Sequence, residues 1–564
     1  MSVFPPQNNS QDPVAITKKI EEIRRREEEQ RAKNLANKLG LSYLNLIMLP
    51  VEADAIRALE ENKARKGKMA IIKQYDKKLS IAVVDPNDNE TKQILEELSA
   101  LGFTWNFAVV SLHSLEKVWN HYKEFSNQTK EIAGTIAISV ELLKNIENEI
   151  KTLDDIRGKI KTIPANEASK IVEVIIAGAL KTNSSDIHIE SKEKETILRY
   201  RIDGLLREIA SLSKKFTNLI ISRIKLLSQI TLNVHDVAQD GRFTIKLDEY
   251  DIENRVSVLP GPYGENIVIR VLNPKSIKPG LKDLGLREDL YQIIEKQIKK
   301  PNGMLVTTGP TGSGKTTALY AFLKASVTPE VKIITLEDPI EYHLPGIVQT
   351  QVETEKGYTF ASGLRAILRQ DPDIVLVGEI RDKETAETAV NAALTGHLVF
   401  STLHTNDAAG AIPRFIELDI KPNILSSAIN IIMAQRLVRT ICPQCKKEIK
   451  PDKETIEKIK NSLKNLSKEI FPIDIDKPFN LYHGQGCSAC DNVGYKGRTA
   501  IFEIIEITKE IEKLISSNPS HIAILEIMIK NGISSMYQDG IIKVLEGMTT
   551  IEEIEKTIQP IKLE

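Results

Sequence analysis

Alternating hydrophobic and polar positions divide the first part of the chain into separate α/β segments. Residues 35–120 hold the apolar stretch LSYLNL, a helical pattern around 52–64 and two short strands, MAIIKQ and LSIAVVDP, which together predict a small first domain. Residues 1–34 are predicted to be a disordered start and a charged helical arm, since a run of charges is typical of a solvated face. Residues 121–165 are polar, helical in places and rich in Lys, Glu and Asn, and we interpret them as a linker.

The pattern further along the chain predicts a second small domain and a larger third one. The second covers residues 166–275 and begins with an apolar helix at 168–183. Alternating strands follow that helix: SDIHIE, ETILRYRID, GRFTIKL, IENRVSVLP and ENIVIRVLN. Residues 281–564 form the third domain, which contains short apolar runs typical of buried strands and, over 501–564, a helical pattern.

Composition narrows the classes of protein that fit. The chain has 564 residues, 41% hydrophobic and 27% charged, which is enough for several cores. Its 76 basic and 77 acidic residues leave a formal charge of −1, so the bulk charge gives no sign of a nucleic-acid partner. No apolar run approaches the roughly 18 residues of a membrane span, and the N-terminus lacks a signal-peptide pattern. We therefore expect a cytoplasmic protein that contacts the membrane only through partners.

The strongest chemical signal is a phosphate-binding loop of the form G-x-x-x-x-G-K-[ST]. An apolar strand over 304–308 precedes it, and a helix follows from Thr316, which is the context that the motif requires. Glycines allow the backbone to bend round a polyphosphate and to aim its N–H groups inward. Lys315 is predicted to reach the β- and γ-phosphates, and the Thr316 hydroxyl to face Mg²⁺. The predicted nucleotide-binding residues are Gly309, Pro310, Thr311, Gly312, Ser313, Gly314, Lys315, Thr316 and Thr317.

Two acidic sites follow predicted strands of the third domain. The strand at 332–336 ends in Glu337 and Asp338, and such positions at the carboxyl end of a strand are where α/β sheets bind ligands. The strand at 374–377 ends in Gly378-Glu379, where P-loop enzymes place an acid for Mg²⁺ beside a glutamate that prepares water. Because glycine replaces the usual aspartate, Glu379 serves either the metal's water shell or the base, sharing that work with Glu337 or Asp338. An ordinary acidic turn is the alternative for the first site.

His397 and His404 flank one further predicted strand, LVFST. A lone histidine is more often structural than functional. Two histidines flanking a strand beside the phosphate site favour a role as sensors of the γ-phosphate, because imidazole changes its charge near neutral pH.

All four cysteines fall in two C-x-x-C pairs. Cys442 and Cys445 form the first pair, and Cys487 and Cys490 form the second. Four thiolates satisfy tetrahedral Zn²⁺, and each pair supplies two ligands from one turn. A redox pair and unliganded buried cysteines are the alternatives. Two paired turns with no remaining thiol favour a closed structural zinc site.

Arginines are concentrated in the second small domain, at positions 199, 201, 242, 255 and 270. Most surface arginines are solvated or paired. An ATPase that works as a ring nevertheless needs cationic groups that reach the γ-phosphate from a neighbouring part, and these arginines are the candidates for that role.

Taken together, these motifs resemble the secretion ATPases of the type II secretion and type IV pilus superfamily. GPTGSGKTTALY is similar to the family's phosphate loop, ITLEDPIEY to its acidic box, and TGHLVFSTLHTNDA to its histidine box. CPQC, GCSAC and GYKGR resemble its tetracysteine insert, and the likeness extends over residues 35–560. It implies an α/β fold with a RecA-like P-loop ATPase core, a PAS-like α+β N-terminal domain, a further small α/β N-terminal domain and a zinc-binding insert over 440–498.

The resemblance also implies an activity and partners. Members of the family form homohexamers in the cytoplasm, at the inner face of the cell membrane, and hydrolyse ATP to move an inner-membrane platform protein. On this basis the chain is expected to power type IV pilus assembly, with type II secretion as the alternative. Expected cofactors are ATP, Mg²⁺ and Zn²⁺, and no nucleic-acid partner is expected. A nucleic-acid translocase and a scaffold that binds ATP without hydrolysing it are the rival hypotheses.

The resemblance also assigns the family's functional roles to residues of this chain, by the motifs that match. Lys315 and Thr316 are expected to hold phosphate and Mg²⁺, with Asp338 as a further candidate for the metal. Glu337 and Glu379 are expected to share the acid and water-positioning roles. Arg242 and Arg255 are chosen to reach a phosphate across a subunit or domain boundary.

Overall fold

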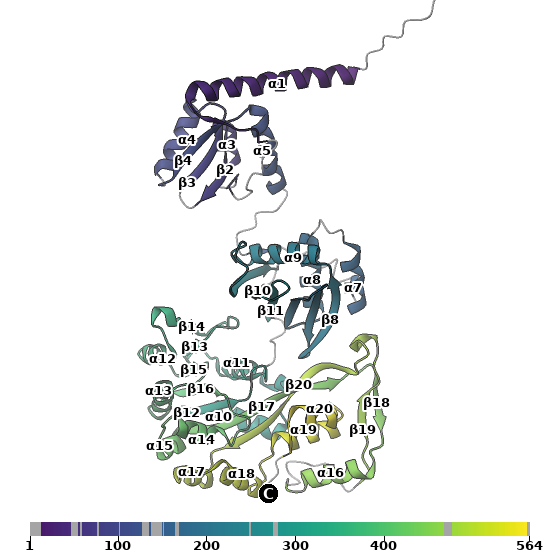
Figure 1. Cartoon of the computed structure of the whole chain (residues 1–564). Helices are drawn as coiled ribbons and strands as arrows, with labels where there is room; N and C mark the ends of the chain where they lie inside the picture. The colour runs from purple at the N-terminus through teal and green to yellow at the C-terminus, as the bar shows by residue number, and fades with distance from the viewer. Residues whose placement is uncertain are drawn as a thin grey trace, which may run out of the picture. The chain divides into compact units, whose positions relative to one another are not determined.

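The computed structural model describes residues 13–46, 55–56, 59–75, 78–100, 102–126, 135–136, 149–150, 152–163, 168–247, 250–274, 280–466 and 477–560. The chain divides into two compact units, residues 1–132 and 133–564, and each is described by itself (Figure 1). The disordered start expected at the N-terminus lies outside the described residues, which begin with helix α1.

The first unit is a four-stranded sheet with helices packed on it. The sheet has the strand order β1-β4-β3-β2, and α1 packs on it through Ala32 and Ala36, which are buried against Val109. The helix expected around 52–64 is observed as α3, from Glu61 to Lys66, and the expected helix start at 52–54 lies outside the described residues. The elements are α1 (Pro13–Leu39), β1 (Ser42–Tyr43), α3 (Glu61–Lys66), β2 (Met69–Tyr75), β3 (Lys78–Val83), α4 (Asn89–Ala100), β4 (Thr104–Val109) and α5 (Leu112–Ser126).

Two helices lie at least partly in the segment 121–165, which we interpreted as a linker that is helical in places. Helix α5 continues to Ser126, and a further helix, α7 (Leu153–Thr162), packs into the core of the second unit. Leu153, Ile156 and Ile160 are spaced three and four residues apart, so they form one buried face of α7. The polar composition around them conceals this short apolar stripe in the sequence.

The N-terminal part of the second unit is a seven-stranded sheet covered on one face by α7, α8 and α9 (Figure 1). Alternate residues of its strands are buried, and the others form a polar face. Neighbouring strands are antiparallel, except that β5 pairs with β9 in parallel. Strand β8 was not anticipated in the sequence. The elements in sheet order are β5 (Thr135–Ile136), β9 (Gln239–Lys246), β10 (Asp251–Leu259), β11 (Asn266–Leu272), β6 (Asp186–Ser191), β7 (Thr196–Ile202) and β8 (Leu205–Leu212), with α8 (Ala168–Lys181) and α9 (Lys214–Leu227).

The C-terminal part is built on a second seven-stranded sheet, whose strands are parallel except for the pair β17 and β20. Its central strands β12, β13, β15 and β16 are buried on both sides, as their apolar runs predicted. The strands in sheet order are β14 (Val348–Gln351), β13 (Ile333–Glu337), β15 (Ile374–Val377), β16 (Leu398–Leu403), β12 (Gly303–Thr308), β17 (Ile429–Ile441) and β20 (Tyr495–Glu506).

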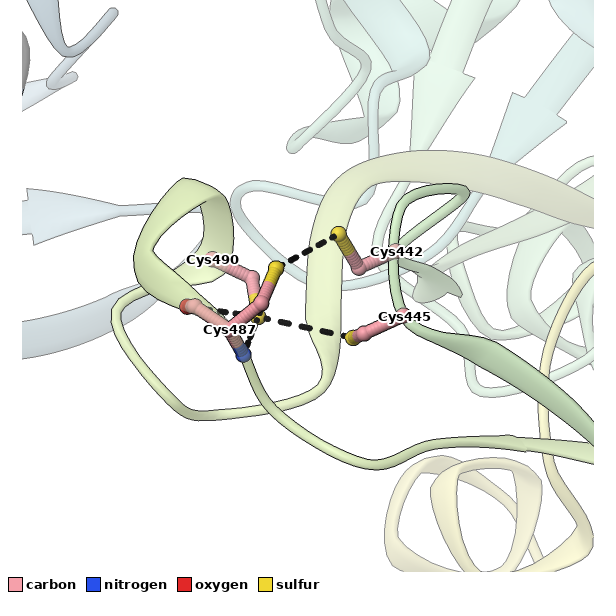
Figure 2. Close-up of side chains that lie close together, drawn as sticks. All are labelled: Cys442, Cys445, Cys487 and Cys490. Carbon is pink, nitrogen blue, oxygen red and sulfur yellow. Dashed lines mark hydrogen bonds between the residues drawn. The ribbon is translucent and has the colours of Figure 1, made fainter.

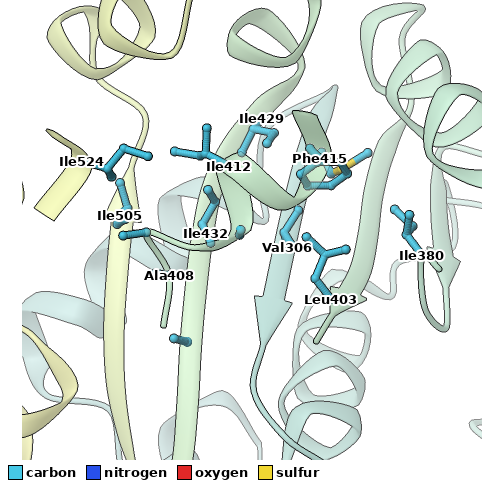
Figure 3. Close-up of a cluster of buried hydrophobic side chains, with 14 of the residues drawn as sticks. Val306, Ile380, Leu403, Ala408, Ile412, Phe415, Ile429, Ile432, Ile505 and Ile524 are labelled. Carbon is cyan, nitrogen blue, oxygen red and sulfur yellow. The ribbon is translucent and has the colours of Figure 1, made fainter. Parts of the chain in front are cut away.

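Helices cover both faces of this sheet. Side chains alternate along each strand, so Val306 of β12 joins the core on one face, shown in Figure 3, whereas Leu305 joins the core on the other. The sequence pattern predicted helix from residue 501, but Ile501 to Glu506 complete β20, and the helices begin at Lys509. The helices are α10 (Glu288–Gln297), α11 (Lys315–Ser326), α12 (Phe360–Leu368), α13 (Lys383–Leu394), α14 (Ala411–Glu417), α15 (Pro422–Ala428), α17 (Lys509–Ser516), α18 (His521–Lys530), α19 (Met536–Leu545) and α20 (Ile551–Thr557).

The four cysteines lie in an insert between β17 and β20. Within it, β18 (Lys446–Ile449) pairs with β19 (Leu481–Gly484), and α16 (Lys453–Leu463) lies between them in the sequence. A short 3-10 helix, η4 (Ser488–Cys490), ends at the last cysteine.

Candidate active site

The phosphate loop joins the buried strand β12 to helix α11, as the motif predicted. Gly309, Gly312 and Gly314 have positive φ angles of 147°, 79° and 93°. A Cβ at Gly309 would lie 2.7 Å from the carbonyl oxygen of Gln435, and a Cβ at Gly314 would lie 2.7 Å from the amide nitrogen of the Gln435 side chain. Glycine is therefore required both by the backbone conformation and by the close approach of β17.

Lys315 lies over this loop and is bonded within it. Its Nζ donates to the carbonyl oxygens of Gly309 at 2.6 Å and Pro310 at 3.2 Å. Burial lowers the pKa of Lys315, Glu379 opposes this shift and Arg436 adds to it. The Ser313 hydroxyl is buried and has no hydrogen-bond partner among the described residues. The loop thus holds an ammonium group and an unpaired hydroxyl where the motif places a polyphosphate.

Glu379 and His404 meet at the carboxyl end of the sheet. The Glu379 carboxylate is largely buried, at 12% exposed, and its Oε2 lies 3.1 Å from His404 Nε2 and 2.7 Å from Arg381 Nε. Glu379 follows β15 and His404 follows β16, which pairs with β12, so both lie at the same end of the sheet as the phosphate loop. A Cβ at Gly378 would come within 3.2 Å of the Leu336 carbonyl oxygen, so there is little room for a side chain at the position where an aspartate is common.

Glu337 is held differently from Glu379. It is the last residue of β13 and is only 4% exposed. Its Oε1 accepts from Thr335 Oγ1 at 2.6 Å and from Gln349 Nε2 at 3.1 Å, and its Oε2 accepts from the hydroxyl of Tyr320 on α11. Burial is the largest cause that raises the pKa of Tyr320, and the Glu337 charge adds to it. Asp338, the next residue, is exposed. Glu337 therefore ties β13 to the helix that follows the phosphate loop.

His397 does not join the site within this chain. It precedes β16, whereas His404 follows it, and the six residues between them span about 20 Å at about 3.3 Å per residue. The register Gly303–Leu398 and Thr308–Leu403 places His404 beside the phosphate loop and His397 at the opposite edge. His397 Nδ1 lies 3.1 Å from the Ala392 carbonyl oxygen, at the end of α13.

Arg242 and Arg255 lie opposite each other on β9 and β10 and line one cavity of about 770 Å³. Arg255 Nη2 donates to the carbonyl oxygen of Ile340 at 2.7 Å, and Arg255 Nη1 lies 3.7 Å from a carboxylate oxygen of Glu341. Arg242 has no side-chain hydrogen bond or ion pair to any described residue. The polar face of the second N-terminal domain thus meets the acidic turn after β13, and one of its arginines stays unpaired there.

A second cavity, of about 320 Å³, borders the phosphate loop directly. Residues that the sequence analysis did not select line it: the turn at 203–205 between β7 and β8, and the basic residues Arg436, Arg439 and Arg498. Arg436 Nη2 donates to the Asn406 carbonyl oxygen at 2.9 Å. Arg436 lies on β17, which is not part of the phosphate-loop motif. Its position beside the phosphate loop follows only from the pairing of β12 with β17.

The four cysteine sulfurs form one cluster, with all four Sγ atoms within 4.8 Å of one another (Figure 2). Sγ–Sγ distances are 3.9 Å for Cys442–Cys487, 3.8 Å for Cys445–Cys490 and 3.7 Å for Cys487–Cys490. Tetrahedral zinc with Zn–S bonds of about 2.3 Å requires sulfurs about 3.8 Å apart, so these residues fit zinc. Burial raises the pKa of Cys490, but backbone N–H groups of Cys487 and Gly494 outweigh it, and the resulting pKa is about 7.

A parallel sheet whose strand β12 enters a glycine-rich phosphate loop, with an acid and a histidine at the neighbouring strand ends, defines a P-loop ATPase with a RecA-like core. The family model described as type II/IV secretion system protein matches residues 165–556, and the chain belongs to this family. It is therefore an ATP-binding ATPase.

Individual relatives agree with this assignment. The type II secretion system ATPase E of Vibrio cholerae is 36% identical over 517 residues, which cover 90% of this chain and 98% of the relative. The type IV pilus assembly ATPase PilB of Myxococcus xanthus is 35% identical over 528 residues, covering 93% and 90%. The X-ray structure of the Legionella pneumophila ATPase DotB matches with a TM-score of 0.50 at 22% identity, over 69% of this chain and 95% of that one. This last likeness concerns the fold alone.

No helix of the described residues is long and apolar enough to cross a membrane.

Proposed function

We propose that this ATPase is a cytoplasmic, ring-forming motor that powers type IV pilus assembly through an inner-membrane platform protein. The observation that carries the proposal is the arginine-bearing face of the second N-terminal domain, which shares a cavity of about 770 Å³ with the acidic turn of the ATPase core. A motor must convert hydrolysis into movement between two parts. Cationic groups from one part that reach the nucleotide held by the other supply that coupling.

The phosphate loop holds the triphosphate. Backbone N–H groups of residues 311–314 and the Lys315 ammonium group contact the phosphates, and the unpaired Ser313 hydroxyl accounts for a further contact. Thr316, in the first turn of α11, and the exposed carboxylate of Asp338 are the residues that would hold Mg²⁺. When bound there, Mg²⁺ would neutralise the negative charge that develops on the phosphate oxygens.

Glu379 is the residue that orients the attacking water. Its carboxylate is bonded to His404 and Arg381, which hold it in one direction, and it raises the pKa of Lys315 against the effect of burial. Through this contact His404 detects the state of the site. Glu337, whose two oxygens already accept three donors, acts as a positioning residue that keeps the acidic turn and α11 together.

Arg242 supplies the cation that crosses to the γ-phosphate. It is unpaired among the described residues, whereas Arg255 already contacts the acidic turn through Ile340 and Glu341. Arg255 therefore docks the second N-terminal domain, and Arg242 responds to the nucleotide from a neighbouring domain or a neighbouring copy. A homohexameric ring would repeat this arrangement, so that successive closures produce a stroke or a rotation.

The cysteine cluster is proposed to hold one structural Zn²⁺, because four thiolates leave no open position for a reacting molecule.

Type II secretion is the second candidate function. The relative from Vibrio cholerae carries that name and is covered over 98% of its length, against 90% for the pilus ATPase of Myxococcus xanthus.

The experiment compares the wild-type chain with Glu379→Gln in cells that lack the chromosomal copy. Purified wild-type protein is expected to elute as a six-subunit species that turns over ATP, and the variant as the same species without turnover. Surface pili restored by the wild type and not by the variant support pilus assembly. Restored export of a secreted enzyme, with no pili, replaces that proposal with type II secretion. ATP turnover that persists in the variant contradicts the role of Glu379.

A further inference from the structure

The cysteine insert contacts a distant part of the chain, the hairpin formed by β7 and β8. Arg207 Nη1 lies 3.2 Å from Asp491 Oδ2, and the backbone N–H of Gly497 donates to Asp203 Oδ2 at 2.8 Å. Arg207 is 12% exposed and Asp491 35% exposed, so the pair is partly shielded from solvent. These two contacts join a segment of the second N-terminal domain to the segment that follows the last cysteine.

The geometry of the cysteine turn fixes where Asp491 lies. Asp491 directly follows Cys490 and has a φ of 51°, a left-handed conformation that Asp and Asn tolerate better than most residues. Cys490 Sγ accepts from the backbone N–H of Gly494 at 3.3 Å. The Gly494 carbonyl oxygen in turn accepts from the N–H of Cys442 at 2.9 Å. The position of Asp491 thus depends on both C-x-x-C turns.

The other side of the hairpin turn faces the phosphate loop. Asp203 and Gly204 have φ angles of 49° and 85°, which form the tight turn between β7 and β8. This turn lines the cavity of about 320 Å³ together with phosphate-loop residues 310–313. The turn is therefore held by the cysteine insert on one side and borders the nucleotide site on the other.

From these contacts we infer that the metal-bound cysteine insert is a clasp that docks the β7–β8 hairpin over the phosphate loop, with Arg207 and Asp203 as its positioning residues. The inference rests on the proposed zinc site. Loss of the metal releases Asp491 and Gly497, the hairpin moves away, and the nucleotide loses one wall of its site. The insert then contributes to nucleotide affinity without touching the nucleotide.

The expected effects are modest, because a partly exposed ion pair contributes little free energy. Removing the Arg207–Asp491 pair is expected to weaken binding of a fluorescent ADP analogue by about two- to fivefold and to speed amide hydrogen exchange over 202–207 by a similar factor. Metal removal breaks both contacts, so it is expected to produce the larger effect on the same two measurements.

The test is a double-mutant cycle on the full chain. Arg207→Gln removes one charge, and Asp491→Asn removes the other while keeping a residue that tolerates the left-handed backbone. The double variant should behave as either single variant does, because both remove the same contact. Lys246→Gln is the matched control: Lys246 is exposed on β9 of the same domain and forms no ion pair with a described residue. It should leave affinity and hairpin exchange unchanged.

Each measurement is repeated after zinc chelation, with metal content determined on every sample. Chelation should speed hairpin exchange in the wild type and add less in Arg207→Gln, where only the Asp203–Gly497 contact remains to be lost. Additive effects of the two single variants would overturn the inference. So would hairpin exchange that is unchanged when zinc is gone. Neither measurement depends on pili, secretion or ATP turnover. Failure of the proposed function would therefore not change the result of this test of the clasp.

Discussion

The imidazole of His404 lies 3.1 Å from the carboxylate of Glu379, and the two side chains come from the ends of adjacent parallel strands. Together with Arg381 at 2.7 Å, this contact holds one carboxylate oxygen in a fixed direction beside the phosphate loop. Glu379→Gln should therefore bind ATP within a few-fold of the wild type, yet lower kcat about 100-fold or more, because the amide accepts no proton from water. Nucleotide titration and phosphate release, measured on one preparation, separate the two effects. A variant that loses binding as well would indicate a role in holding the metal or the phosphates.

His404 and His397 provide a matched pair of substitutions. His404→Ala removes the partner of Glu379 and should lower kcat at least about tenfold with little change in KM, since the carboxylate loses its orientation. His397→Ala, at the opposite end of β16, should change kcat less than threefold, because the His397 ring contacts the Ala392 carbonyl oxygen and not Glu379. Equal losses from both substitutions would show that His397 reaches a site in a neighbouring copy.

Several features of this site could be predicted from the sequence, and the predictions that did not hold have physical causes. The apolar runs before Gly309 and Glu379 predicted buried strands correctly, because strands covered on both faces admit few polar residues. The two histidines looked equivalent because they flank one strand, but in a parallel sheet only residues at the carboxyl end meet the phosphate loop. That rule was sufficient to separate His404 from His397.

Other features of the structure could not be predicted from the local sequence pattern. Arg436 reaches the site because β17 pairs with β12, a contact between residues about 125 positions apart in the sequence, and no short motif records such pairing. The packing of α7 into a core was not predicted within the segment interpreted as a linker, because its three apolar residues are diluted by Lys and Asp. Residues 501–506 of β20 were interpreted as helix, since the run FEIIEI has no clear alternation when both faces of a strand are covered.

Substitution of Glu337 tests whether this residue has a positioning role or a catalytic one. Glu337→Gln replaces one carboxylate oxygen with an NH₂ group, which then faces either the Tyr320 hydroxyl or the donors of Thr335 and Gln349, so it should lower the free energy of unfolding by about 2–3 kcal/mol. Tyr320→Phe removes only one of those donors and should cost about 1 kcal/mol. Urea unfolding, together with kcat, measures both effects. A Glu337→Gln chain of unchanged stability that has lost turnover would instead identify Glu337 as the base.

Zinc content is expected to decide the stability of the insert. The wild-type chain should carry one zinc ion per subunit, and Cys442→Ser should lose it, since three thiolates leave the tetrahedral site incomplete. The melting temperature of the variant should fall, because binding energy at such a site is also folding energy. Metal analysis and thermal melting, with and without chelator, measure both quantities. An unchanged melting curve on chelation of the wild type would refute a structural metal.

Glu503 on β20 makes stability depend on pH. Its carboxylate is 1% exposed and accepts from the backbone N–H groups of Ala408 at 2.8 Å and Met536 at 3.3 Å. Burial is the largest cause that raises its pKa, which reaches about 7. Because this value lies above the unfolded value of 4.5, the protonated form is favoured on folding. The stabilisation is complete below pH 4.5 and is lost as the pH rises through about 7, and it amounts to about 3 kcal/mol over that interval.

Glu503→Gln isolates this contribution, since the amide does not titrate and the remaining groups are shared with the wild type. The difference in melting temperature between the two chains should shift in favour of the wild type as the pH falls from 7.5 to 5. Below about pH 4.5 the difference should level off, because both folded and unfolded Glu503 are then protonated. Glu510→Gln, a similar change at an exposed glutamate bonded to Lys530, is the control: Lys530 lowers the pKa of Glu510 below its usual value of 4.5, so the difference for this variant should stay constant from pH 7.5 to 5. Melting curves of wild type and Glu503→Gln that stay parallel from pH 5 to 7.5 would contradict a raised pKa at Glu503.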